Sequence, residues 1–184
     1  MVSLSSFAVR RALLVMFICR HCPYVQHVQA ELAAIGREYA ARDVGIVAIS
    51  SNDASKYPDD APASLRDMAV ELGLGFPFCH DESQETAKAY TAACTPDFFL
   101  FDSARRLVYR GQLDDSRPGN GKPVTGRDLR AALEALLAGR PVPSGGQGAG
   151  VAVGEDGGFF GDGGEAVLSH GLAGLHVVVV DLEG

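Results

Sequence analysis

Several residue types are scarce in this sequence, and each shortage excludes a class of protein. Four cysteines in 184 residues are far fewer than a secreted domain held by disulfides would carry. All 16 lysines and arginines lie before residue 141 and form no basic stripe with interleaved aromatic residues, so we expect no nucleic-acid partner. The apolar runs, such as residues 12–19, are short, whereas a helix needs about 20 apolar residues to cross a bilayer. We therefore expect no membrane span.

The N-terminal segment has some features of a secretory signal. Arg10 and Arg11 precede the apolar run 12–19, but this run is short and no small-residue cleavage site follows it. We therefore expect a cytoplasmic protein. In that compartment, a few cysteines indicate thiol chemistry or metal binding and not a covalent framework.

Hydrophobic periodicity predicts alternating strands and helices. Continuous apolar runs are typical of strands buried on both faces, and apolar residues spaced by three and four are typical of amphipathic helices. The expected strands are 12–18, 44–50, 76–80, 97–101 and 106–110, and helices are expected between them and after the last one. The order predicts an α/β fold with a central mixed β-sheet flanked by helices, in which the last two strands form an antiparallel hairpin.

Local signals predict where the helices begin. The first follows Pro23 and runs to about residue 40, and the second runs from Pro62 to Gly73. Asp81, with Gln84 three residues later, predicts a capped start for a helix that continues through Tyr90. Thr125 is expected to cap the last helix, and Gly139 lies beyond its end.

The C-terminal part differs in composition from the rest. Residues 141–184 contain 13 of the 22 glycines and six acidic residues, with no lysine or arginine. Burial cannot offset the ordering entropy of so much glycine, so we expect one domain over 1–142 and a Gly-rich, acidic, disordered tail over 143–184. The valine run 177–180 either adds an edge strand or is a short apolar segment without function.

Cys19 and Cys22 form a CxxC pair between the first strand and the first helix. Unpaired N–H groups and the positive end of the helix dipole favour a thiolate at Cys19. Cys22 could then attack the resulting mixed disulfide, and His21 could add a positive charge or a hydrogen bond. We expect Cys19 to be the more exposed, attacking sulfur and Cys22 the resolving one.

Two other interpretations of the pair stay open. The cysteines could form a structural disulfide, or half of a zinc site with His21 and His27. A structural zinc ion needs four closed ligands, and the adjacent side chains of His21 and Cys22 rarely converge, so we assign no metal ligand.

A second group of candidate residues precedes the strand 97–101. The Thr95-Pro96 bond can be cis at modest cost, and Pro96 opens a core strand. Cys94 is either a small buried hydrophobe or a third thiol that reaches the CxxC pair. Cys79 lies in a short apolar strand and is expected in the core.

The motifs resemble a known family. A CxxC at the start of the first long helix and a Thr-Pro before the final hairpin resemble the thioredoxin fold. The segments "MFICRHCPYVQH", "VAISSND", "YPDDAP", "ACTPDFFLFD" and "LVYRGQLDDSRPGNGKPVTG" are similar to bacterial peroxiredoxin-like proteins of the alkyl hydroperoxide reductase and thiol-specific antioxidant type. The resemblance implies a cis-proline loop that lies against the CxxC and holds disulfide or thiol substrates. It also implies a reductant such as thioredoxin or glutathione, and no cofactor.

The match departs from peroxiredoxins at their active-site motif. Their Pro-x-x-x-Thr/Ser-x-x-Cys pattern has no counterpart here, because Cys19 or Met16 stands at the hydroxyl position and Val15 or Ala12 at the proline position. We therefore expect thiol-disulfide exchange. Thiol peroxidase activity and a non-catalytic metal-binding or interaction module are the alternatives.

The loop 112–125 should begin beside the CxxC pair. The strand 97–101 starts at that edge of the sheet, and its antiparallel partner must end there. Asp115 and Arg117 could therefore orient a substrate or assist proton transfer at the thiols. The alternative is that the loop is only a connection.

Overall fold

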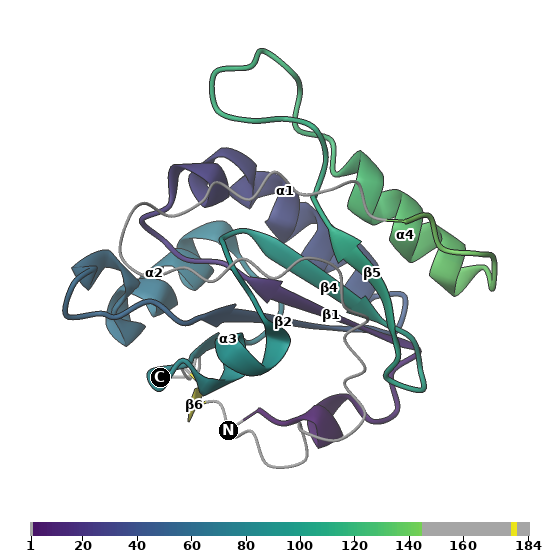
Figure 1. Ribbon diagram of the computed structural model, residues 1–184, viewed down its shortest axis with the longest axis horizontal. Helices are drawn as coiled ribbons and strands as arrows, with labels where there is room; N and C mark the ends of the chain where they lie inside the picture. The colour runs from purple at the N-terminus through teal and green to yellow at the C-terminus, as the bar shows by residue number, and fades with distance from the viewer. Residues whose placement is uncertain (1, 145–177, 180–184) are drawn as a thin grey trace.

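A six-stranded mixed sheet forms the centre of the computed structural model, which describes residues 2–144 and 178–179 (Figure 1). The strand order is β5-β4-β1-β2-β3-β6. The strands are β1 Ala12–Phe17, β2 Val44–Ser50, β3 Phe78–His80, β4 Asp97–Phe101, β5 Leu107–Gly111 and β6 Val178–Val179. The helices are α1 Pro23–Ala40, α2 Pro62–Leu72, α3 Glu85–Tyr90 and α4 Arg127–Leu137, with short 3-10 turns η1 Leu4–Phe7 and η2 Pro58–Asp60.

The two faces of the sheet bury separate cores, because successive side chains of a strand point to opposite faces. Leu14 and Met16 of β1 pack with residues of α1, α2 and α4. Val15 and Phe17 pack on the other face with Phe7 of η1 and residues of α3 and β4. Figure 1 shows this division, with α1 and α4 on one side of the sheet and α3 on the other. The expected α/β fold is confirmed.

Strand directions bring three distant segments to one edge of the sheet. β1 is parallel to β2 and antiparallel to β4, so Phe17 at the end of β1 lies opposite both Ile49 and Asp97. β5 is antiparallel to β4, and its last residue, Gly111, pairs with Phe98. The segment after β1, the segment before β4 and the loop after β5 therefore meet at this edge, as the strand order predicted.

Two expected cap residues do not occupy the N-cap positions of their helices. The third helix begins at Glu85, not after Asp81. The carboxylate of Asp81 still binds the start of α3, because it accepts the N–H of Ala87, the third residue of the helix, as well as the Ser51 hydroxyl. The N-cap of α4 is Gly126, not Thr125. Gly126 has φ 64°, a left-handed conformation that favours glycine.

The expected strand 76–80 is shortened at its start. β3 covers only Phe78–His80, and the carbonyl of Pro77 accepts the Ala48 N–H before the strand begins. Proline has no N–H to donate to a ladder, so Pro77 cannot extend the strand pairing as a donor.

Among the described residues, no helix is long and apolar enough to cross a membrane.

The predicted tail, 143–184, lies outside the described residues except at 143–144 and 178–179. Val178–Val179 pair antiparallel with Cys79 and His80 of β3. The valine run therefore supplies a short edge strand, the first of its two interpretations.

Candidate active site

The CxxC pair lies where β1 passes into α1. Ile18 continues the pairing with β2 through its N–H to the Ile49 carbonyl at 3.0 Å. Cys19 follows in a buried position. Cys22 is the N-cap residue of α1, and Pro23 occupies the first helical position, where its missing N–H costs nothing. Both sulfurs are therefore held beside the positive end of an 18-residue helix.

The loop before β4 contacts both sulfurs. The Thr95-Pro96 peptide bond is cis, as the sequence allowed. The Thr95 hydroxyl lies 3.3 Å from Cys19 Sγ, and Cys22 Sγ lies 3.4 Å from the Thr95 carbonyl oxygen, to which it donates when it is protonated. Thr95 is the direct neighbour of the thiol pair, and Pro96 is held next to it at the edge of the sheet.

The two thiols are free and titrate as a unit. A hydrogen bond from the Cys19 thiol lowers the pKa of Cys22 to about 5, and burial opposes this less strongly. N–H groups of Tyr24 and Val25 also lower it. The same bond to Cys22, together with burial, raises the pKa of Cys19. The pair therefore loses its first proton easily and retains the second.

The predicted difference in exposure between the two cysteines is wrong. Cys19 is 0% exposed, whereas Cys22 is partly exposed. The reason is topological: Cys19 still lies against the core at the strand end, and the turn to α1 carries Cys22 outward. The resting pair has its negative charge and its accessible sulfur at Cys22, so exposure does not support the expected order of attack.

A buried carboxylate that sequence reasoning missed lies beside the pair. Asp60 is 0% exposed. One of its oxygens accepts the backbone N–H groups of Arg20 and His21 at 2.7 and 3.2 Å. The other lies 2.5 Å from Nδ1 of His21 and accepts the Asn52 amide at 2.8 Å. Asp60 thus fixes the backbone between the two cysteines and the ring of His21.

His21 is held on a second side by an aromatic ring. Tyr57 stacks on the imidazole with ring centroids 4.4 Å apart and an interplanar angle of 6°. Asp60 and Tyr57 come from the segment "YPDDAP", in which polar and proline residues indicate only a turn. No spacing in the sequence distinguishes Asp60 from its exposed neighbour Asp59, so tertiary contacts alone identify it.

The other two cysteines differ in their relation to the pair. Cys79 is buried in the second core as predicted, and burial raises its pKa to about 12. Cys94 is half-buried next to Thr95. Burial and the nearby Asp97 raise the pKa of Cys94 to about 11, and the charge of Cys22 acts in the same direction. Cys94 therefore lies within electrostatic range of the thiol pair, as a protonated thiol.

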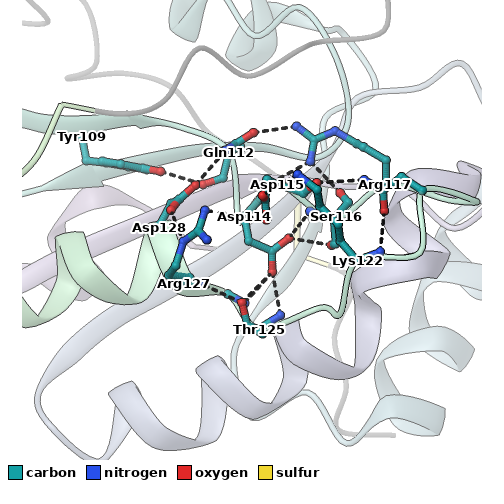
Figure 2. Close-up of polar contacts among 12 residues, drawn as sticks. Tyr109, Gln112, Asp114, Asp115, Ser116, Arg117, Lys122, Thr125, Arg127 and Asp128 are labelled. Carbon is teal, nitrogen blue, oxygen red and sulfur yellow. Dashed lines mark hydrogen bonds and ion pairs between the residues drawn. The ribbon is translucent and has the colours of Figure 1, made fainter.

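The loop after β5 begins at the predicted edge, but its polar residues bind mainly one another (Figure 2). Arg117 donates to the carbonyls of Asp114 and Ser116 and to the Gln112 side chain. Asp115 pairs with Lys122 at 2.7 Å and lies 3.6 Å from Arg127. The contacts described for Arg117 and Asp115 stay within this loop and the start of α4.

Asp114 organises the loop from inside. It is 1% exposed, and its carboxylate accepts the N–H groups of Ser116, Thr125 and Gly126, each within 2.9 Å. Burial alone would raise the pKa of Asp114, but these bonds and the Ser116 hydroxyl lower it to about 2. These internal hydrogen bonds give the loop a defined conformation, in which Asp115 and Arg117 hold fixed positions.

Comparisons with known proteins agree with this geometry. The Redoxin family model matches residues 1–129. A crystal structure of an uncharacterized conserved protein from Geobacillus kaustophilus has 57% identity and a TM-score of 0.74, over 76% of this chain and 74% of that one. A hypothetical protein from Sinorhizobium meliloti has 51% identity and a TM-score of 0.75, over 76% of each chain.

A more distant structure shares the fold alone. A thiol-disulfide isomerase from Corynebacterium glutamicum has 23% identity and a TM-score of 0.57, over 75% of this chain and 88% of that one. No curated protein matches the chain.

Proposed function

The chain belongs to the Redoxin family, and from this premise we propose that it is a thiol-disulfide oxidoreductase that uses Cys19 and Cys22. Membership in the family supports an oxidoreductase acting on thiol groups. The observation that carries the finer proposal is the pair itself: two free thiols that share a proton at a helix N-terminus, both in contact with Thr95. Its substrates are protein or small-molecule disulfides, and a thiol reductant such as thioredoxin or glutathione regenerates the pair.

The exchange cycle follows from the shared proton. The thiolate of the pair attacks one sulfur of a substrate disulfide, and the other substrate sulfur leaves as a thiolate that takes up a proton. The second cysteine then loses its proton and attacks the mixed disulfide, which releases the reduced substrate and leaves a Cys19-Cys22 disulfide. Two electrons and two protons from the thiol reductant, which becomes a disulfide, restore the two thiols. A cytoplasmic location fits this cycle, since the cytoplasm keeps thiols reduced.

Mass spectrometry of the full chain tests the proposal directly. The protein is treated with dithiothreitol, with a small disulfide and with peroxide, and the state of each cysteine is mapped. We expect a reversible Cys19-Cys22 disulfide and unchanged Cys79. A pair that stays reduced in the presence of excess small disulfide would end the proposal.

Thiol peroxidase activity is the second candidate, and one contact favours it. The peroxiredoxin motif is absent from the sequence, but the Thr95 hydroxyl lies 3.3 Å from Cys19 Sγ and could bind a peroxide oxygen. Steady consumption of peroxide with a thiol reductant, lost in a Thr95→Val variant that still exchanges disulfides, would support this candidate. Disulfide exchange without peroxide turnover would exclude the peroxidase and leave thiol-disulfide exchange as the one proposed activity.

The pH dependence of alkylation should reveal the shared proton. Because only the thiolate reacts and the pKa of Cys22 is lowered to about 5, iodoacetamide should modify Cys22 first. The rate should rise as the pH passes about 5 and be nearly constant by pH 7, whereas an ordinary thiol still gains reactivity above about pH 8. In Cys19→Ala, which removes the hydrogen bond with the largest effect, the midpoint should move up by more than about one unit. First modification at Cys19 would contradict this assignment of charge.

Asp115 and Arg117 are proposed to contact a macromolecular substrate. The loop that carries them begins at the edge of the sheet where the thiol pair lies, and its internal hydrogen bonds hold both side chains in a defined arrangement. Asp115→Ala and Arg117→Ala should each slow exchange with a protein disulfide by about threefold to tenfold, a loss typical of one or two charge contacts, and leave exchange with a small disulfide nearly unchanged. Equal effects on both substrates, or none on either, would leave the loop as a connection.

A further inference from the structure

We propose that the reduced protein binds zinc through Cys19, His21, Asp60 and Cys22. Ligand atoms of the first three residues, one sulfur, one ring nitrogen and one carboxylate oxygen, all lie within 4.8 Å of one another. Cys19 and Asp60 are buried, and His21 is one-third exposed. This combination of sulfur, nitrogen and oxygen ligands is typical of zinc.

The structure supplies a metal ligand that the sequence does not indicate. The sequence argues against a zinc site made from Cys19, Cys22, His21 and His27, because the adjacent side chains of His21 and Cys22 rarely converge, and the Cys22 sulfur indeed lies outside the group formed by Cys19, His21 and Asp60. Asp60 changes the set of ligands, because it comes from η2 and reaches the turn between the two cysteines. Convergence of Cys19, His21 and Asp60 then depends on the tertiary fold, which brings η2 to the turn between β1 and α1.

The charges of the ligands also suit a divalent cation. Metal ions bind cysteine as the thiolate and histidine as the neutral imidazole, so binding would release protons from the site. Nδ1 of His21 and the carboxylate oxygen of Asp60 already lie side by side, 2.5 Å apart. Two thiolates, one carboxylate and a neutral imidazole carry three negative charges against the two positive charges of zinc, and no buried ligand stays protonated.

Two side chains must move to complete the geometry, and one of them is Cys22, whose sulfur must turn toward the group of three ligand atoms. Zinc binds nitrogen and oxygen ligands at about 2.0–2.2 Å and sulfur at about 2.3 Å, so tetrahedral ligands stand about 3.3–3.8 Å apart. The His21 ring must therefore move away from Asp60, and it can do so by sliding over the face of Tyr57. The other contacts of Asp60, with the N–H groups of Arg20 and His21 and with Asn52, hold the carboxylate in place and serve as outer-shell partners.

Zinc binding and disulfide formation exclude each other, because both use the two sulfurs. Zinc would therefore hold the protein in its reduced, inactive form and release it when free zinc falls. This control of exchange rests on the proposed function, whereas metal binding itself does not.

The test titrates the reduced full-length chain with Zn²⁺ in competition with a chromophoric chelator. We expect one ion per chain, with no binding by the Cys19-Cys22 disulfide form. Asp60→Asn and His21→Phe should each weaken binding by about tenfold or more. The matched controls, Asp59→Asn at the exposed neighbouring acid and Cys94→Ser, should bind as the wild type does. Phe at position 21 keeps a ring for Tyr57 to stack on, so this variant tests the ligand even if Asp60→Asn unfolds.

Two results would overturn the site. Wild-type affinity in both Asp60→Asn and His21→Phe would mean simple chelation by the dithiol, and binding by the disulfide form would exclude the sulfurs. Co²⁺ supplies an independent readout, because thiolate-to-cobalt charge-transfer absorption should appear in the wild type and fall in Cys22→Ser. Exchange with a small disulfide in zinc-free buffer tests the proposed function separately, and added Zn²⁺ should slow that exchange in the wild type more than in His21→Phe.

Discussion

Replacing either Cys19 or Cys22 with serine should lower multiple-turnover exchange by about a thousandfold or more, because residues that act as a unit fail together. A single remaining sulfur can form a mixed disulfide but cannot resolve it. The fold should survive both changes, since a serine at either position keeps a hydroxyl within reach of Thr95. Steady-state turnover with a small disulfide measures the loss at a dithiothreitol concentration low enough that the reductant's own attack on the substrate and on the mixed disulfide is slow.

The same variants should trap a substrate. Incubation with a disulfide-containing protein should give a mixed disulfide through the remaining sulfur, visible as a mass increase that dithiothreitol reverses. The variant that traps faster keeps the attacking sulfur, which settles the order that exposure and sequence position indicate differently. Cys94→Ser is the control, and near-wild-type turnover there would exclude a third thiol in the cycle. Turnover that persists in Cys19→Ser or Cys22→Ser would refute the two-thiol mechanism.

The layout of the fold could be predicted because its signals are local. The runs at β1, β2 and β4 are continuous and apolar, the pattern of strands buried on both faces, and the spacing within α1 matches the helical repeat. Pro62 and Gly73 bound α2, as expected from their backbone preferences. The resemblance to the thioredoxin fold predicted the loop with Thr95 and Pro96 beside the CxxC pair, and strand direction predicted that the loop after β5 begins at the same edge.

The contacts that could not be predicted are those between segments distant in the sequence. Thr125 and Asp81 have the side chains of good caps, but neither occupies the N-cap position, and Asp81 reaches the first turn of α3 from before the N-cap while it also accepts the Ser51 hydroxyl. The prediction that Cys19 is more exposed than Cys22 was wrong for the same reason, because the burial of Cys19 depends on elements that pack around the end of β1. Asp60 is the most important residue that the sequence did not identify. Its sequence context indicates a solvated turn, and only the tertiary fold buries it against the turn between Cys19 and Cys22.

Asp60→Ala should lower the free energy of unfolding by about 3 kcal/mol or more at pH 7, because it leaves several buried donors without an acceptor. The carboxylate accepts four hydrogen bonds, from the N–H groups of Arg20 and His21, the His21 ring and the Asn52 amide. The first two donors lie in the turn that precedes α1, where no helical carbonyl can replace the lost acceptor. Urea unfolding of the wild type and the variant measures the difference.

Asp59→Ala is the matched control, because Asp59 is exposed in the same 3-10 turn and should change the stability by less than about 0.5 kcal/mol. Asp60→Asn should fall between the two, since the amide keeps one acceptor oxygen but loses the charge that strengthens the bonds. Asp60→Asn should also affect the thiol pair, because the turn that Asp60 fixes carries both cysteines. In this variant, the pKa of Cys22, read from the pH dependence of alkylation, should respond less to Cys19→Ala than it does in the wild type. An Asp60→Ala protein as stable as Asp59→Ala would show that water satisfies these donors and that the carboxylate does not hold the turn.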